Sequence, residues 1–276
     1  MTTRRASLAW LGTGWALAGA ATAQRPPLRI ALAPFLSPAA LLAVFRPLRE
    51  HLEHALQRPV EMVTSRDFHS LVGEARRGEH DVVQLPAHLA RLAMLDWRYQ
   101  MLAGPDERVE VVVGVRGAGP VRSIGDLRGQ RVGMLDALSL TATVGRAWLQ
   151  AQGLDGAVTV VAQPSVNAAL YALERGEIGA FVAADTQLAT LPASTPRGER
   201  VLVRIGGIPG PLFLARHDLP AAEREDLRAA LLAFQPDPAR PRAASNAPLR
   251  PVPAASMAAL DAYVVVARQL LAQGAR

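Results

Sequence analysis

A stretch of hydroxyl-bearing residues between Asp136 and Thr143 has the composition of an anion-binding site. Ser139, Thr141 and Thr143 are spaced two apart, directly after a predicted strand and at the start of a predicted helix. The first turn of a helix offers unpaired backbone N–H groups and the positive end of the helix dipole, and hydroxyls add further donors. This combination could hold an oxyanion without any full positive charge. Plain helix capping by Ser139 or Thr141 explains the same residues equally well.

The composition excludes several kinds of chemistry. The 276 residues include no cysteine and no lysine, so thiol nucleophiles, disulfides, iron–sulfur ligation, Schiff bases and a phosphate-loop lysine are ruled out. We find no nucleophile and base pair with motif support and no histidine and carboxylate spacing of a metal site. The sequence therefore predicts a protein that is not an enzyme and that has no catalytic residues, cofactor or metal.

The basic charge does not indicate nucleic-acid binding. The formal net charge is +6, and all 30 basic residues are arginines, which never titrate near neutrality and so raise the pI to about 10.9. A nucleic-acid-binding protein typically has its basic residues clustered on one element, with aromatic residues among them. Here the arginines are scattered along the chain, so we expect no nucleic-acid partner.

Residues 1–23 are typical of an export signal. Arg4 and Arg5 precede a short apolar segment that ends in Ala21-Thr22-Ala23, small residues of the kind that signal peptidases read. The apolar segment is shorter than the about 20 residues that span a membrane. We predict cleavage near Ala23, a mature protein in the periplasm and no stable membrane insertion. The arginine pair partly resembles a twin-arginine signal, so the export route stays open, and a buried N-terminal helix is the alternative interpretation.

From Leu28 onward, segments with strand character alternate with segments of helical periodicity, which is typical of an α/β fold with parallel strand pairing. A helix, a glycine stop and a strand recur about a hundred residues apart, at Gly78 and at Gly176. This recurrence favours two lobes of similar plan, although a glycine that ends a helix before a strand is common enough to recur by chance. The predicted strands are 28–33, 60–63, 81–85, 109–115, 131–135, 158–161, 180–182, 201–205 and 212–215. The predicted helices are 41–57, 68–77, 88–95, 141–152, 166–175, 221–234 and 257–273, with a helical turn at 123–129.

Several segments follow one another in a distinctive order and spacing. They are Pro47–Leu56 with Pro59-Val60-Glu61, Gly78–Val82, Ser123–Val132, Ser139–Leu149 with Gly153-Leu154, and Ala215–Pro220. In this order and spacing, the chain from about Leu28 to Phe234 resembles the solute-binding proteins of phosphate, phosphite and phosphonate ABC transporters. The resemblance implies the two-lobed periplasmic binding protein fold of the second type, with each lobe a mainly parallel sheet flanked by helices. We assign 24–112 and 206–276 to lobe 1 and 113–205 to lobe 2.

The family features are only partly present in the candidate site. Members have a run of serine, threonine and glycine that grips the phosphonate oxygens, but here Leu140 interrupts the run and Ala142 replaces a hydroxyl. Where the family has a Ser-His-Asp step, this chain has Ser165, Val166 and Asn167, and His88 lies near the position of a usual tyrosine. We retain Ser165 and Asn167 as candidate ligand contacts. His88 could donate to an anion or make an ordinary polar contact.

Three further candidates follow from the resemblance. Phe35, at the end of the first strand, could line the cleft or belong to the core. The aminated ligands of the family need carboxylates near their ammonium group, and Glu177 and Asp185 are the candidates. Asp185 lies just past a predicted strand, and open sheets bind ligands at strand ends. Simple solvation is the alternative for Glu177.

The resemblance implies a monomer that binds a small oxyanion, similar to phosphonate or phosphate, and hands it to the membrane permease of an ABC transporter. An alternative keeps the fold but changes the partner: a ligand-sensing accessory protein that docks on a membrane sensor kinase. Opposed lobes can enclose a small ligand almost completely and couple its binding to a hinge movement, which suits either role.

Overall fold

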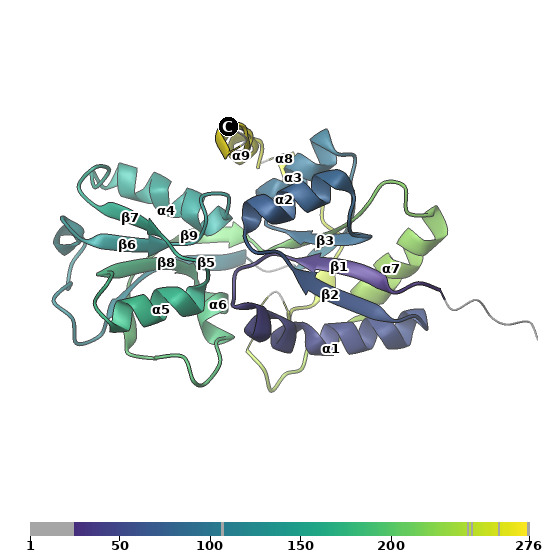
Figure 1. Ribbon diagram of the computed structural model, residues 1–276, viewed down its shortest axis with the longest axis horizontal. Coiled ribbons are helices and arrows are strands. Elements are labelled where there is room, and N and C mark those ends of the chain that lie inside the picture. Colours follow the sequence, from purple (N-terminus) through teal and green to yellow (C-terminus); the bar gives the residue numbers. More distant parts are fainter. Residues whose placement is uncertain (1–24, 106–107, 242, 244, 259, 275–276) are drawn as a thin grey trace, which may run out of the picture.

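The computed structural model describes residues 25–105, 108–241, 243, 245–258 and 260–274, and the predicted export signal lies outside these ranges. The described chain forms two lobes, each with one β-sheet covered by helices on both faces (Figure 1). This architecture confirms the predicted α/β class and the two-lobed plan. No described helix is long and apolar enough to cross a membrane.

The first lobe is built on a sheet with the strand order β11-β4-β10-β3-β1-β2. Helices α2 and α3 cover one face, with α9 packed outside α3, and α1 and α7 lie together on the other face (Figure 1). The strands are β1 (Leu28–Leu32), β2 (Val60–Thr64), β3 (Val82–Leu85), β4 (Gln100–Pro105), β10 (Leu212–Ala215) and β11 (Leu249–Arg250). The helices are α1 (Pro38–Leu56), α2 (Phe68–Arg77), α3 (Ala87–Asp96), α7 (Ala221–Ala233), α8 (Ala254–Ala258) and α9 (Asp261–Gly274).

The second lobe repeats this plan around a sheet with the order β7-β6-β8-β5-β9. Helix α4 covers one face and α5 the other (Figure 1). The strands are β5 (Arg108–Arg116), β6 (Arg131–Met134), β7 (Thr159–Ala162), β8 (Ala180–Ala184) and β9 (Glu199–Pro209). The helices are the 3-10 turn η1 (Gly125–Leu127), α4 (Leu140–Ala151), α5 (Val166–Glu174) and α6 (Asp185–Ala189).

A glycine allows the core of the second lobe to close. Gly114 on β5 lies opposite Phe181 on β8, whose ring is completely buried. A Cβ atom built on Gly114 would lie 2.2 Å from that ring, so any larger residue would push Phe181 out of the core. The valines of β5 on either side of Gly114 are buried, which agrees with a strand covered on both faces.

Both sheets are mixed, which corrects the prediction of mainly parallel pairing. Strands β1, β2 and β3 are parallel, as are β6, β7 and β8. Strand β10 runs antiparallel to β3 and β4, and β5 runs antiparallel to β8 and β9. The physical reason is connectivity: a chain that leaves the first lobe and returns to it adds strands of opposite direction to each sheet.

The chain crosses between the lobes twice, first between the end of β4 at Pro105 and the start of β5 at Arg108, and again between the end of β9 at Pro209 and the start of β10 at Leu212. Strand β9 continues through Gly206 and Gly207, beyond the predicted strand end at Ile205, because a register shift beside Val111 accommodates Gly206 at φ 131°. The sequence pattern also does not predict β4 or α6. Strand β4 ends in Gly104-Pro105, and α6 is only five residues long, so neither produces a clear periodicity.

Candidate functional site

A cavity of about 80 Å³ lies between the two lobes and beside both crossings. A space of this size holds several water-sized groups and therefore suits a small ligand. Its lining comes from the ends of strands, the starts of helices and the crossing segments, as in other open α/β sheets. The lining residues are Ala33, Phe35, Phe68, Pro86, Pro105, Val109, Leu135, Ser139, Leu140, Thr141, Ala184, Thr186, Gln187, Thr190, Ile208, Pro209, Gly210, Pro211, Ala243, Ser245 and Ala247.

The start of α4 opens into this cavity. Ser139 is the N-cap of the helix, and its hydroxyl oxygen accepts a hydrogen bond from the Ala142 N–H at 3.1 Å. The hydroxyl of Thr141 lies 3.3 Å from that of Ser139, and the two residues are only 2% and 5% exposed. Ser139 therefore both caps the helix and lines the cavity. Its hydroxyl accepts a hydrogen bond from the helix and can still donate its own proton to a ligand.

The backbone adds donors at the same place. The Thr143 N–H donates to the Ser139 carbonyl, so the helical bonds begin there. Among the described residues, none accepts a hydrogen bond from the N–H of Leu140 or Thr141, which leaves both groups available at the positive end of the helix dipole. The third predicted hydroxyl, that of Thr143, donates back to the Ser139 carbonyl at 3.1 Å and does not line the cavity.

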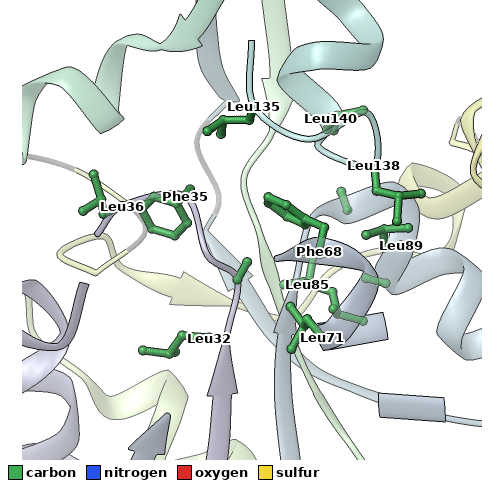
Figure 2. Packing of buried hydrophobic residues seen from close by; sticks show 14 of the residues in the cluster. Leu32, Phe35, Leu36, Phe68, Leu71, Leu85, Leu89, Leu135, Leu138 and Leu140 are labelled. Carbon is green, nitrogen blue, oxygen red and sulfur yellow. The ribbon is translucent and has the colours of Figure 1, made fainter. Parts of the chain in front are cut away.

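The rest of the cavity is mostly apolar. Figure 2 shows Leu135 and Leu140 of the second lobe placed opposite Phe35 and Phe68 of the first. Phe35 is 8% exposed and also packs edge-on against Phe45, with ring centroids 6.4 Å apart. The two interpretations of Phe35 thus combine, since the ring belongs to the core and one side of it faces the cavity.

The start of α5 meets the first lobe instead of the cavity. The Val166 N–H donates to the Phe35 carbonyl at 3.2 Å, and the Asn167 Oδ1 accepts from the Ser37 N–H at 3.3 Å. Ser165 caps α5 by accepting from the Ala168 N–H. Ser165 and Asn167 are both buried, but neither lines the cavity. The Asn167 amide serves the contact between the lobes, and the Ser165 hydroxyl serves the cap of α5.

His88 is buried at the start of α3 and does not line the cavity. Neither ring nitrogen has a hydrogen-bond partner in the described chain. Burial lowers the pKa of His88 to about 4, and the nearby backbone of Leu138 opposes only part of this effect. The imidazole is therefore neutral at physiological pH and contributes no positive charge to the site.

The two predicted carboxylates have other partners. Glu177 is exposed and pairs with the Arg175 guanidinium at 2.5 Å, which holds the pKa of Glu177 below its ordinary value. Asp185 accepts hydrogen bonds from the N–H groups of Glu110 at 3.2 Å and Thr186 at 2.7 Å. Neither carboxylate lines the cavity.

Four polar lining residues lie outside the sequence prediction. Thr186, Gln187 and Thr190 belong to α6 or directly follow it, and Ser245 lies in the proline-rich segment before β11. The Gln187 side chain accepts from the Ala184 N–H at 3.0 Å, which fixes its direction. The short α6 has little periodicity, so the only sequence signal for these residues is their position just after the buried strand β8.

One cluster outside the cavity has metal-ligand chemistry. Glu74, Glu79 and His80 place one ligand atom each within 4.8 Å of one another. The His80 Nε2 lies 3.0 Å from the Glu74 carboxylate, which also accepts from the Ser65 hydroxyl at 2.6 Å. Glu79 pairs with Arg77. The protein itself thus supplies a partner for each of the three groups.

Two mixed α/β lobes, two crossings and a cavity between the lobes define the class of two-lobed periplasmic binding proteins. Known structures share this arrangement. PhnD1 from Prochlorococcus marinus in complex with methylphosphonate gives a TM-score of 0.73 at 13% identity, covering 88% of this chain and 97% of that chain. A binding protein component of an ABC phosphonate transporter from Pseudomonas aeruginosa gives 0.68 at 12%, covering 91% and 99%. A Xanthomonas citri protein bound to ATP gives 0.63 at 18%, covering 88% and 98%.

The sequence identifies the family within this class. Residues 30–260 match the family model described as ABC transporter, phosphonate, periplasmic substrate-binding protein, so the chain belongs to that family. The family resemblance of the sequence is thereby confirmed. No curated protein gives a significant sequence match. The three solved structures named above are below 20% identity and support the fold alone.

Proposed function

We propose that the protein is an exported receptor that captures a small oxyanion between its lobes and delivers it to the permease of an ABC transporter. The observation that carries this proposal is the start of α4, where Ser139, Leu140 and Thr141 line the cavity between the lobes. This turn has two buried hydroxyls and two backbone N–H groups without an acceptor among the described residues. Membership of the phosphonate-binding family supports the same conclusion.

The site stabilises an anion through dipoles. Backbone N–H groups at a helix start carry roughly half a positive charge in total, and hydrogen bonds from hydroxyls add to this. Once a bound ligand displaces the water of the cavity, these bonds become electrostatically stronger than they would be at the surface. An oxyanion held by α4 on one lobe and contacted by Phe68 on the other would keep the lobes closed, and a membrane permease could recognise the closed form.

The first step is to find the ligand class with purified mature protein. Thermal shift measurements against phosphate, phosphite, methylphosphonate, sulfate and ethanesulfonate test it directly. A ligand that binds the folded state raises the melting temperature in proportion to the logarithm of its concentration above its Kd. Absence of stabilisation by every one of these oxyanions would contradict the proposed function.

The second step tests the site itself. We expect Ser139→Ala combined with Thr141→Ala to weaken binding of the stabilising oxyanion by about 1 to 3 kcal/mol, measured by titration calorimetry, because hydrogen bonds to a charged group are lost. The matched control is Ser165→Ala, which removes a buried serine N-cap from the neighbouring helix α5 outside the cavity. The control should lose stability but keep its affinity. Equal affinities in the double variant and the wild type would place the ligand elsewhere.

A further inference from the structure

We propose that the ligand of this cavity is an oxyanion with a single negative charge and an apolar substituent, and that the cavity selects against dianions and amines. This inference rests on the proposed function and specifies its substrate class. It follows from three features of the described lining: its limited positive potential, its lack of a carboxylate that could pair with an amine, and its apolar surface.

The positive potential in the cavity suits one negative charge. Among the described residues that line it, none carries a charge, and the donors are neutral hydroxyls, an amide and the start of α4. The helix supplies only about half a unit of positive charge. A buried charge without a partner is strongly unfavourable, so a second negative charge on the ligand would remain largely uncompensated. A dianion is therefore expected to stay in water.

The described part of the lining also offers no partner for an ammonium group. The described lining includes no carboxylate. Asp185 directly precedes the lining residue Thr186, but it accepts from the Glu110 and Thr186 N–H groups and lies 3.7 Å from the Arg204 guanidinium. Glu177 is exposed and paired with Arg175. An amine on the ligand would therefore lose its hydration without gaining a negative partner.

The wall that faces α4 is apolar. It includes four large buried residues: Phe35 and Phe68 of the first lobe, Leu135 of the second lobe, and Ile208 beside the crossing. Each CH₂ group that a ligand buries against such a surface strengthens binding by about fourfold. A short alkyl group can occupy this space while the oxyanion head lies at α4. The cavity thus offers separate places for the head and for the substituent.

Two pairs of ligands test this selectivity by titration calorimetry with the full mature protein. Propane-1-sulfonate and 2-aminoethanesulfonate have the same number of heavy atoms and differ by a methyl group in place of an ammonium group. Ethanesulfonate and sulfate share the oxyanion head and differ in net charge. We expect the alkanesulfonate of each pair to bind at least about tenfold more tightly, a difference of about 1.4 kcal/mol. Equal or tighter binding of 2-aminoethanesulfonate or sulfate would overturn the inference.

The pH dependence of methylphosphonate binding tests the charge separately. Its affinity should fall as the pH is raised from about 5.5 to about 8.5, because the second proton of such groups dissociates in this range. Propane-1-sulfonate remains a monoanion throughout and should show no comparable loss. An affinity for methylphosphonate that rises with pH would show that the cavity prefers the dianion, contrary to the inference.

A nearly isosteric substitution should reverse the selectivity. Gln187→Glu keeps an oxygen for the Ala184 N–H and introduces a carboxylate at the cavity wall. We expect binding of propane-1-sulfonate to weaken by about tenfold or more and binding of 2-aminoethanesulfonate to improve. The control, Gln100→Glu, makes the same change at an exposed residue at the far end of β4 and should alter neither affinity.

The outcomes separate the two proposals. If oxyanions bind and depend on Ser139 and Thr141, but sulfate or 2-aminoethanesulfonate binds best, only the selectivity inference fails. If uncharged apolar molecules bind and no oxyanion does, the proposed function fails as well. An unchanged preference in Gln187→Glu, with the variant folded and still binding, would show that Gln187 does not contact the ligand and would contradict the inference that the charge of the lining sets the selectivity.

Discussion

At the scale of single residues, His88 has the clearest consequence outside the cavity. It stands near a position where the family resemblance implies a tyrosine, yet its ring is 1% exposed and unpartnered in the described chain. Burial lowers its pKa from 6.5 to about 4, so protonation opposes folding. The native state therefore holds the His88 imidazole in its neutral form. Because protonation of this buried ring is unfavourable, the stability of the folded protein depends on pH.

The sign of this dependence follows from proton linkage. Between about pH 6.5 and pH 4 the unfolded chain binds a proton at His88 and the folded chain does not, so stability falls as the pH falls through this range. The stabilisation is complete above about pH 6.5. The largest contribution is roughly 3 kcal/mol, at about 1.4 kcal/mol per pKa unit.

We expect His88→Gln to remove this component. Urea unfolding at several pH values between about 4 and about 7 should give a shallower slope of stability against pH than the wild type. His54→Gln, which replaces an exposed histidine of α1, tests whether the loss of any histidine has this effect. Identical slopes in His88→Gln and the wild type would show that His88 is not the buried neutral group described here.

At the scale of elements, the N-cap of α2 connects helix stability to the site. The Asp67 side chain accepts from the Ser70 N–H at 2.7 Å. The helix that follows begins with Phe68, which lines the cavity, and His69, whose Nδ1 lies 3.4 Å from the Asp136 carboxylate of the other lobe. Fraying of this first turn would disturb both contacts.

We expect Asp67→Ala to lower the free energy of unfolding by about 1 kcal/mol, because a helix N–H loses its capping partner. Asp67→Asn keeps a capping oxygen and should retain most of the stability. Urea denaturation measures both, and binding of the stabilising oxyanion should weaken in the alanine variant only. Equal stability of the alanine and asparagine variants would contradict a capping role.

At the scale of the whole molecule, the two lobes are held together by contacts that need no ligand. The first turn of α5 bonds to the Phe35–Ser37 segment of the other lobe through the Val166 N–H and the Asn167 side chain. The His69 and Asp136 pair adds a third contact across the cleft. These bonds favour the closed arrangement, so the free protein should populate it substantially.

Loss of one such bond should therefore open the protein. We expect Asn167→Ala to increase the radius of gyration of the ligand-free protein in solution scattering and to speed ligand dissociation by about fivefold, the effect of one hydrogen bond of about 1 kcal/mol. Asn167→Asp keeps an acceptor for the Ser37 N–H and should behave like the wild type. A larger radius of gyration in both variants, or in neither, would show that the Asn167 hydrogen bond to Ser37 does not hold the lobes together.

Much of the fold follows from local sequence signals. The boundaries of α2 agree with the prediction, because the Asp67 cap and the Gly78 stop act on their immediate neighbours. Ser139 and Ser165 both occupy the predicted helix starts. Strand β4 is different: its sequence is short and ends in Gly-Pro, and its pairing with β10 joins residues more than a hundred positions apart. Local periodicity cannot predict such a strand.

The sequence by itself determined the alternation of strands and helices, the capped helix starts, the family and the presence of an anion-binding pattern before α4. Tertiary structure alone decided which helix start faces the cavity and which meets the other lobe, since Ser139 and Ser165 are equivalent as caps. It also decided that Asp185 turns to the Glu110 backbone while Gln187 lines the cavity. The physical reason is that capping depends on residues three positions apart, whereas the charge and shape of a cavity depend on how distant segments pack.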